Sequence, residues 1–274
     1  MRVRDRLIFA LAAVIVACGV WGFFWEPSRL SVVEHDLPLK HWPASLNGLR
    51  IAAISDIHAG SPWIDREKLE RMVALTNAAK PDVIVLLGDY VIQNVPGGKF
   101  FPPEDLAKIL AGLKAPQGVY AVTGNHDQWL DATRVMKAFK AENIRVLHNH
   151  AVKLPGGFWL MGIAYMRDFR IAEVLAEQVK DDAPVIMLTH GPDIFPAVPP
   201  RVNLMLAGHT HGGQVNLPLV GRMIVPSAYG KRYAAGHVRE QTDLFVTTGV
   251  GTSIIPVRFG VPPEISLLTV RADG

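Results

Sequence analysis

From residue 49 onward, short stretches of wholly apolar residues alternate with longer amphipathic stretches. Apolar stretches such as residues 82–88 and 184–189 predict strands that are covered on both faces, because a half-exposed strand would alternate polar and apolar residues. Stretches such as residues 66–80 and 131–143 carry apolar residues at helical spacing. Strands and helices that alternate in this way predict an α/β fold built of packed layers.

The same pattern places the other predicted elements along the chain. Predicted strands cover residues 49–55, 82–88, 119–124, 144–147, 158–164, 184–189, 203–208, 243–249 and 264–270. Predicted helices cover residues 66–80, 103–113, 131–143 and 170–182, and loops rich in glycine or proline cover residues 191–200 and 212–236. The chain contains no internal repeat, so we expect one folded domain over residues 49–274.

Composition narrows the possible functions. Of the 274 residues, 49% are hydrophobic and 19% are charged, which is typical of a globular protein. The formal net charge is +3, and the Lys and Arg residues form no long cluster with aromatic residues between them. Nucleic acid is therefore not implied as the main ligand. Cys18 is the single cysteine, so an intrachain disulfide and a zinc site made of thiolates are excluded.

Residues 7–25 form a separate apolar segment without a charge. At about 1.5 Å per residue, a helix of this length reaches roughly 28 Å, close to the thickness of a bilayer core. Trp21 and Trp25 fall where interfacial aromatic residues occur, and three arginines in residues 1–6 favour a cytoplasmic N-terminus. We therefore expect residues 1–25 to be a single-pass anchor in the cell (inner) membrane, with the rest of the chain on the periplasmic or extracellular side.

Two other interpretations of this segment stay open. It could be a cleaved signal peptide, although no A-x-A cleavage site is evident and the apolar stretch is longer than usual. It could also be a lipoprotein signal, because residues 15–18 resemble a lipobox that ends in Cys18. In all three cases the domain is anchored to a membrane or exported. Residues 26–48 are expected to be a juxtamembrane connector that includes one short strand.

Five of the predicted strands are followed directly by Asp, Asn or His residues. These residues are Asp56, His58, Asp89, Asn125, His126, Asp127, His190, His209 and His211. In α/β sheets the binding site lies beyond the carboxyl ends of the strands, so we expect these side chains to meet at one edge. Nitrogen and oxygen donors of this kind are typical of a transition-metal site.

The spacing within the motifs supports this convergence. Asp56 and His58 are two residues apart, as are His209 and His211, so in an extended segment each pair would point to one side. A glycine directly precedes three of the motifs and would allow a close backbone approach; these glycines are Gly88, Gly124 and Gly208. Each motif alone is common in loops and turns, and their joint occurrence at strand ends indicates the site.

The order D-x-H, G-D, G-N-H-D, H and G-H-x-H resembles the calcineurin-like metallophosphoesterase superfamily over about residues 49–270. The bacterial membrane-associated or exported branch is the most similar, because of residues 208–215, 249–253, 256–259 and 262–265. The resemblance implies a two-sheet β-sandwich flanked by helices. It also implies metal-dependent hydrolysis of a phosphate ester, by a water or hydroxide that bridges two metal ions.

The resemblance further implies a role for each motif residue. One metal would be held by Asp56, His58, Asp89 and His211, and the other by Asp89, Asn125, His190 and His209, so that Asp89 bridges them. The two divalent ions could be Mn, Fe, Zn or Mg, and histidine-rich ligation favours a transition metal such as manganese. His126 would stabilise charge or act as a general acid, and Asp127 would orient it.

Further residues are candidates for contact with a substrate phosphate, and solvated loop charge or packing is the alternative interpretation of each. They are Tyr229, Lys231, Arg232, Arg258, Arg167 and Asp168. The substrate class implied is a phosphorylated small molecule or lipid, cleaved as a phosphodiester or a monoester.

Two other functions stay open. A pyrophosphatase could act on a nucleotide-linked lipid of the UDP-diacylglucosamine type, but it would need a site that faces the cytoplasm. A non-catalytic scaffold with the same fold is a remote alternative, because such proteins usually lose ligands and this chain keeps all of them.

Overall fold

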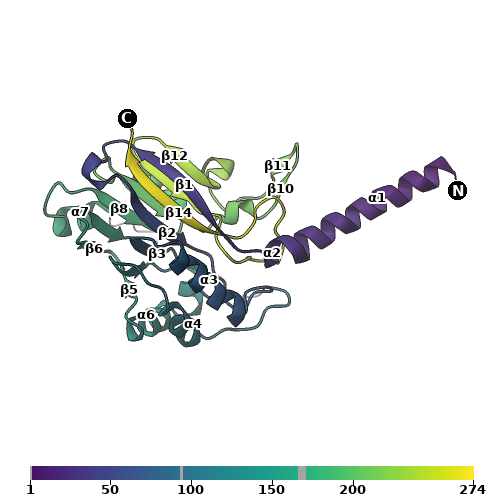
Figure 1. Ribbon diagram of the computed structural model, residues 1–274, viewed down its shortest axis with the longest axis horizontal. Helices are drawn as coiled ribbons and strands as arrows, with labels where there is room; N and C mark the ends of the chain where they lie inside the picture. Colours follow the sequence, from purple (N-terminus) through teal and green to yellow (C-terminus); the bar gives the residue numbers. More distant parts are fainter. Residues whose placement is uncertain (1, 93–94, 166–170) are drawn as a thin grey trace.

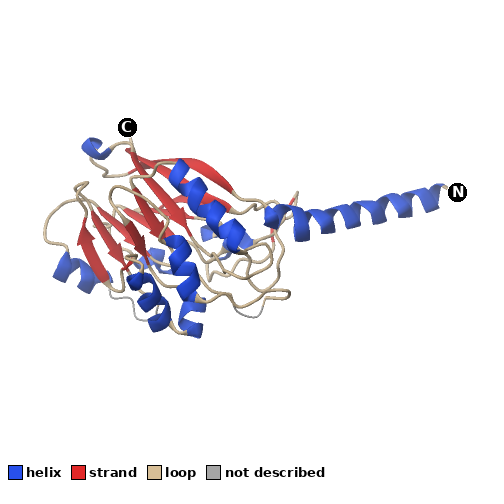
Figure 2. Cartoon of the chain, turned by 60° about the horizontal axis from the view of Figure 1, so that its bottom comes forward, coloured by secondary structure: helices blue, strands red, loops and turns tan. Residues whose placement is uncertain are grey.

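The apolar stretches predicted as strands form two six-stranded sheets in the computed structural model, which describes residues 2–92, 95–165 and 171–274. Figure 1 shows the sheets packed in layers, with a long N-terminal helix that projects from one end of the domain. Figure 2 shows helices on the outside of the layered sheets. The α/β class with two mixed sheets flanked by helices is therefore confirmed.

The first sheet has the strand order β1-β14-β2-β3-β4-β5. Its strands are β1 (Ser31–Leu39), β14 (Glu264–Ala272), β2 (Leu49–Ile54), β3 (Val83–Leu86), β4 (Val119–Ala121) and β5 (Arg145–Val146). Strands β2 to β5 are parallel, β14 is antiparallel to β2, and β1 is parallel to β14. The carboxyl ends of β2, β3 and β4 therefore lie at the same edge.

The second sheet has the strand order β12-β13-β9-β8-β7-β6. Its strands are β12 (Gly236–Arg239), β13 (Asp243–Val246), β9 (Leu204–Ala207), β8 (Val185–Leu188), β7 (Trp159–Gly162) and β6 (His150–Lys153). The central strands β13, β9, β8 and β7 are parallel, and both edge strands are antiparallel to their neighbours.

Burial on both faces explains why the strands are apolar throughout. Along β2, Ile51 and Ala53 pack into the cluster between the two sheets, whereas Ala52 and Ile54 pack into the cluster on the outer side of the first sheet. The outer face of the second sheet has its own cluster, which includes Met187 and Met205. Helices cover the outer clusters: α3 (Arg66–Ala78), α4 (Pro103–Leu110), α6 (Ala132–Ala141) and α7 (Ile171–Gln178).

The N-terminal helix begins with α1 (Val3–Val20) and continues through a π-helical turn (Trp21–Trp25) into α2 (Glu26–Ser28). Within the described residues, Val3–Ser28 is the helix that is long and apolar enough to cross a membrane, and little of it is buried against the domain. By length and composition, a membrane anchor and a signal sequence both match this helix.

The segment predicted as a connector differs from the expectation. The one short strand expected there is the nine-residue edge strand β1, which pairs with β14 along its whole length. Its polar residues and Pro38 suit an edge strand, because an edge has one face and one row of hydrogen-bonding groups toward solvent. The folded domain therefore begins before residue 49.

Several short elements lie outside the predicted strands and helices. They are α5 (Asn125–Leu130), β10 (Asn216–Leu217), β11 (Gly221–Arg222) and the 3₁₀ turns Ala44–Leu46, Pro192–Ala197, His211–Gly213 and Gly230–Tyr233. Of these, the β10–β11 hairpin lies beside the base of the N-terminal helix in Figure 1.

Candidate metal centre

The carboxyl ends of β2, β3, β4, β8 and β9 bring the predicted motif residues together. Nitrogen and oxygen atoms of their side chains lie within 4.8 Å of one another in overlapping groups. These groups are Asp56–His58–His211, His58–Asp89–His126 and Asp89–His190–His209. The two sheets therefore contribute to one buried centre, as the position of the motifs at strand ends predicted.

Asp89 lies in the middle of this centre. Its Oδ2 atom is 3.2 Å from His190 Nε2, 3.7 Å from His58 Nε2 and 3.9 Å from His126 Nε2. Its Oδ1 atom accepts a hydrogen bond of 2.9 Å from the backbone N–H of His126. One carboxylate thus faces imidazoles that come from both sheets.

The imidazole rings face one another in two pairs. His58 Nε2 is 3.2 Å from His211 Nε2, and His190 Nε2 is 3.1 Å from His209 Nδ1. The Nδ1 atoms of His58 and His190 lie next to backbone carbonyl groups, at 3.3 Å and 2.7 Å, and a carbonyl oxygen can only accept. The neutral forms of these two rings therefore direct the Nε2 lone pair into the centre, as in metal-binding histidines.

Buried polar atoms that lack a hydrogen-bond partner also occur in the centre. They include Asp56 Oδ1, Asn125 Oδ1 and His211 Nδ1. A buried polar atom without a partner is costly, so such atoms at one place call for a ligand. With the facing imidazole nitrogens, this donor set fits transition-metal ions, whose ligands are neutral imidazoles, amide oxygens and carboxylates.

The ionisation of the centre suits cations. Burial lowers the pKa of His58 to about 3 and that of His209 to about 4, so both rings stay neutral near pH 7. Burial opposes the charge of Asp89, but the neighbouring histidines, His190 above all, outweigh it and hold the pKa of Asp89 below its usual value. Burial raises the pKa of Asp56 to about 6. Burial opposes the charge of His190 as well, but Asp89 outweighs it and raises the pKa of His190 to about 9. Ligands must lose their protons to bind a metal, so an ion bound at His190 would displace this proton.

The backbone at the motif residues is in the left-handed region, in contrast to the extended segments that were expected. The φ angles are 53° at Asp56, 45° at His58, 55° at Asp89, 71° at His209 and 51° at His211. Such angles cost non-glycine residues energy and are concentrated at functional sites. Sharp turns of the chain, and not strand periodicity, therefore place the members of each pair; Asp56 and His58 share one group, whereas His209 and His211 belong to different groups.

Glycines permit the close approach that the motifs require. A Cβ atom at Gly124 would lie 2.1 Å from Asp89 Oδ1, and one at Gly208 would lie 2.0 Å from Ser55 Oγ. Neither position could accept even alanine without displacement of the strand ends. The expectation for these two glycines is confirmed.

The Asp127 carboxylate supports the turn that carries Asp89. It accepts hydrogen bonds from the backbone N–H groups of Asp89 at 2.9 Å, Tyr90 at 2.9 Å and Gly124 at 2.8 Å. Burial raises the pKa of Asp127 to about 7, with the charge of Asp89 as a further cause. Asp127 thus links the turn that carries Asp89 to the turn that carries Gly124.

His126 lies beside Asp89 and its side chain is 10% exposed, against 2% for Asp89; the sequence indicated few of the residues around it. Its Nε2 atom is 3.5 Å from Ser253 Oγ, and its ring centroid is 4.7 Å from that of Trp129. Tyr165 lies against His190 and His209, with ring centroids 5.4 Å and 5.5 Å away. Of these three, only Ser253 had a sequence signal, because it ends the segment 249–253 that resembles the family.

Arg258 is fully buried and its guanidinium group donates only to backbone carbonyl groups among the bonds observed. The acceptors are Gly251, Val261, Thr248 and Gly249, at 2.6 to 3.2 Å. The expectation that Arg258 contacts a substrate is therefore not supported, because its nitrogens are already engaged within the loop. This side chain holds the loop in place.

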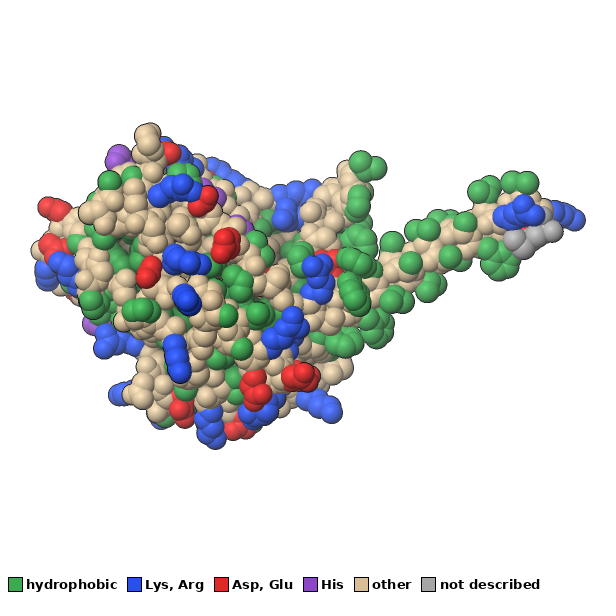
Figure 3. All heavy atoms as spheres, in the orientation of Figure 1, with side chains coloured by type: hydrophobic (Ala, Val, Ile, Leu, Met, Phe, Trp, Pro, Cys, Tyr) green, Lys and Arg blue, Asp and Glu red, His purple; other side chains and the backbone are tan. Residues whose placement is uncertain are grey.

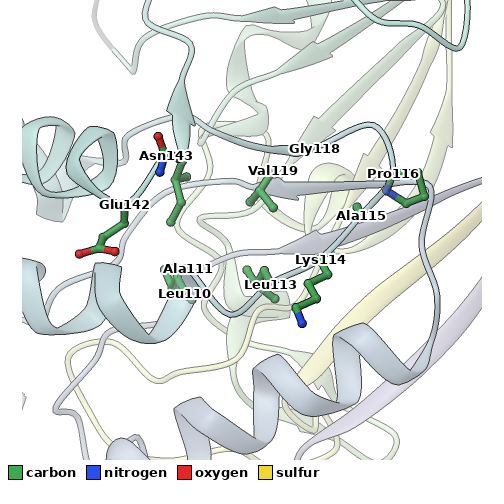
Figure 4. Close-up of a pocket in the computed structure, with 11 residues that line it drawn as sticks. Leu110, Ala111, Leu113, Lys114, Ala115, Pro116, Gly118, Val119, Glu142 and Asn143 are labelled. Atoms are coloured by element: carbon green, nitrogen blue, oxygen red, sulfur yellow. The ribbon is translucent and has the colours of Figure 1, made fainter.

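The other substrate candidates lie outside the buried groups. Arg232 forms an ion pair of 2.7 Å with Glu240, and Tyr229 is partly exposed and packs against Tyr233. Arg167 and Asp168 lie outside the described residues. A pocket shown in Figure 4 lies between the end of α4 and the segment before β5, and its lining residues include none of the motif residues.

Buried Asp and His side chains gather at the strand ends of a two-sheet α/β domain. This arrangement is that of a metal-dependent hydrolase. The sequence pattern of the family described as "Calcineurin-like phosphoesterase" matches residues 49–213, and the chain belongs to this family. It is a metallophosphoesterase.

Relatives along nearly the whole chain agree with this. A Bacillus subtilis protein, "Uncharacterized metallophosphoesterase YkuE", is 32% identical over 97% of this chain and 95% of its own length. "Phosphodiesterase YaeI" of Escherichia coli is 30% identical over 97% of this chain and 98% of its own length. The Danio rerio "Transmembrane protein with metallophosphoesterase domain" is 30% identical over 95% of this chain but only 62% of its own length.

Proposed function

We propose that this protein hydrolyses a phosphodiester or a phosphomonoester with two divalent metal ions. The observation that carries the proposal is the position of the Asp89 carboxylate between two groups of imidazoles. Asp56, His58, Asp89 and His211 would hold one ion, and Asp89, Asn125, His190 and His209 would hold the other. When bound, such ions neutralise phosphoryl oxygens and lower the pKa of a coordinated water.

The residues around the ions complete the proposed mechanism. His126 Nε2 lies 3.9 Å from Asp89 Oδ2 and 3.5 Å from Ser253 Oγ, where it would hold a proton close to a leaving-group oxygen or stabilise charge there. Asp127 keeps the Asp89 turn in position through backbone N–H groups, so it acts through Asp89. The Tyr165 ring packs against His190 and His209 and forms that side of the centre.

We further propose that the helix Val3–Ser28 is retained as a membrane anchor with the N-terminus in the cytoplasm and the domain outside, as in the membrane-associated bacterial branch. The contacts of its last residues support this. Arg258 donates its backbone N–H to Gly22, Trp63 Nε1 donates to Phe23, and Lys68 Nζ donates to Pro27. Cleavage on the C-terminal side of these residues would leave the buried Arg258 N–H and Lys68 Nζ without partners.

The proposal is tested on the full chain in detergent after removal of metals. Hydrolysis of a chromogenic phosphodiester and a chromogenic monoester is measured with and without Mn²⁺, Zn²⁺, Fe²⁺ or Mg²⁺, and bound metal is counted per chain. We expect metal-dependent turnover and about two ions per chain. Asp89→Ala should lose both ions and at least about 10³-fold in turnover, because the carboxylate faces both groups of ligands.

His148→Asn, an exposed histidine outside the centre, is the control and should behave like the unmodified chain. Loss of a single ion from Asp89→Ala would refute the bridging role. Two bound ions without turnover on either ester would refute hydrolysis of simple esters and leave only a narrower substrate.

A further inference from the structure

Two exposed apolar segments lie close to the base of the N-terminal helix. We call their side chains the apolar rim: Leu219, Val220, Met223, Ile224, Ile254 and Ile255, all at least half exposed. Figure 3 shows apolar side chains gathered on the face from which the helix projects, including the protruding hairpin. Large exposed apolar surfaces on a soluble domain mark an interaction site.

Hydrogen bonds connect the two segments of the apolar rim to each other. Asn216, at the base of the hairpin, donates its backbone N–H to Phe259 at 2.7 Å. Gln214 donates from Nε2 to the carbonyl of Ile255 at 3.2 Å and accepts from the Ser253 N–H at 2.7 Å. The rim is therefore one fixed surface and not two independent loops.

The end of the helix is held against this same surface. The Glu26 carboxylate is buried and accepts the backbone N–H groups of Gly260 at 3.0 Å and Val261 at 2.6 Å. Arg258 N–H donates to the Gly22 carbonyl at 2.9 Å, and Gly22 packs against Val257 and Phe259. The direction in which the helix leaves the domain is thus set by the loop that also carries Ile254 and Ile255.

The segments that carry the rim, residues 212–235 and 249–263, contain basic residues and no Asp or Glu. The basic residues are Arg222, Lys231, Arg232, which pairs with Glu240, and the buried Arg258. Apolar side chains flanked by cations are typical of surfaces that enter the interface of a bilayer with anionic lipids.

We propose that the apolar rim is a bilayer-docking surface: its side chains enter the interfacial layer of the membrane that the N-terminal helix crosses. The proposal rests on the anchor proposed above and does not depend on hydrolysis. Ile254 directly follows Ser253, whose hydroxyl group lies 3.5 Å from His126 Nε2. In the docked domain the metal centre would therefore lie next to the membrane surface, where phosphoester groups of lipids lie.

The test measures depth in the bilayer. The full chain is reconstituted into vesicles of phosphatidylcholine and phosphatidylglycerol, with a fluorophore on one cysteine and nitroxide-labelled lipids as quenchers. The native Cys18 reports on the helix, and Leu219→Cys, Ile254→Cys and Asp182→Cys are made in a Cys18→Ser chain. Asp182 is the control, because it follows α7 at the end of the domain opposite the helix in Figure 1.

We expect strong quenching at Cys18 and at both rim positions, at least about threefold above the residual quenching at Asp182. Quenching at Cys18 with rim positions as weak as Asp182 would overturn the docking surface and leave the anchor intact. Absence of quenching at Cys18 would overturn both the anchor and the docking surface. Neither outcome would bear on hydrolysis, which is measured separately with soluble esters.

Discussion

Single residues of the centre have separate tasks, and Asp89 and His126 illustrate the division. Asp89 has its backbone held by Asp127 and its carboxylate surrounded by imidazoles. His126 lies beside Asp89 and next to Ser253, and its side chain is more exposed than that of Asp89. The first arrangement suits a group that holds ions, and the second suits a group that meets a substrate.

His126→Asn should therefore slow turnover without loss of metal. We expect about two bound ions per chain and a turnover reduced by roughly 10²–10⁴-fold, the usual contribution of a general acid or base. Metal analysis and steady-state kinetics on the same preparation check this. Unchanged turnover with unchanged metal content would exclude the role, and loss of metal would instead make His126 a ligand.

Among the elements, the loop from Thr248 to Val261 depends on one buried side chain. Arg258 donates to backbone carbonyl groups along this loop, and burial lowers its pKa to about 10. The loop also carries Ser253 and contacts the end of the N-terminal helix through Glu26. Substitution of Arg258 should therefore lower the free energy of unfolding.

Arg258→Lys keeps the charge but cannot reproduce the planar fork of donors. We expect the free energy of unfolding to fall by about 3 kcal/mol, because at least two buried carbonyl groups lose a charged donor. Thermal unfolding of the full chain in detergent measures it. Arg232→Lys, in an exposed ion pair, is the control and should change stability by less than about 0.5 kcal/mol. An unchanged melting temperature with a raised KM would restore Arg258 as a substrate contact.

The elements also explain what sequence could and could not predict. β2, β3 and β8 were predictable because burial on both faces makes their residues apolar throughout. β1 was expected only as a short strand, because an edge strand keeps polar residues and a proline. Motif residues were predictable from their position at strand ends. Their left-handed turns, and the contacts of Tyr165 and Trp129 with the histidines, depend on distant parts of the chain and leave no local signal.

At the scale of the whole molecule, Lys68 connects the end of the N-terminal helix to the domain. Its Nζ donates to the Pro27 carbonyl at 2.7 Å, and burial, with the nearby charge of Arg258 as a further cause, lowers its pKa to about 7. Between about pH 7 and its ordinary pKa, the unfolded chain binds more protons at this residue than the folded chain. The free energy of unfolding should therefore rise with pH in this range, by up to roughly 1.4 kcal/mol per pH unit.

The measurement compares the melting temperatures of the unmodified chain and Lys68→Met in detergent from about pH 7 to about pH 10. The melting temperature of the unmodified chain should rise relative to that of Lys68→Met as pH rises. Lys108→Met, at an exposed lysine that pairs with Asp105, serves as control and should give a difference independent of pH. If the difference in melting temperature between Lys68→Met and the unmodified chain stayed constant, Lys68 would be solvated and the end of the N-terminal helix would not contact it.

The place of β14 in the first sheet affects how the protein is made. This strand, residues 264–272, lies between β1 and β2, so two segments from early in the chain pair with one from its end. During synthesis β1 has no partner until nearly the whole chain has left the ribosome, and pairings so distant in sequence form slowly. A chain held at a membrane by its first helix would meanwhile present an unpaired β2 edge, so nascent chains need protection from aggregation until the last strand arrives.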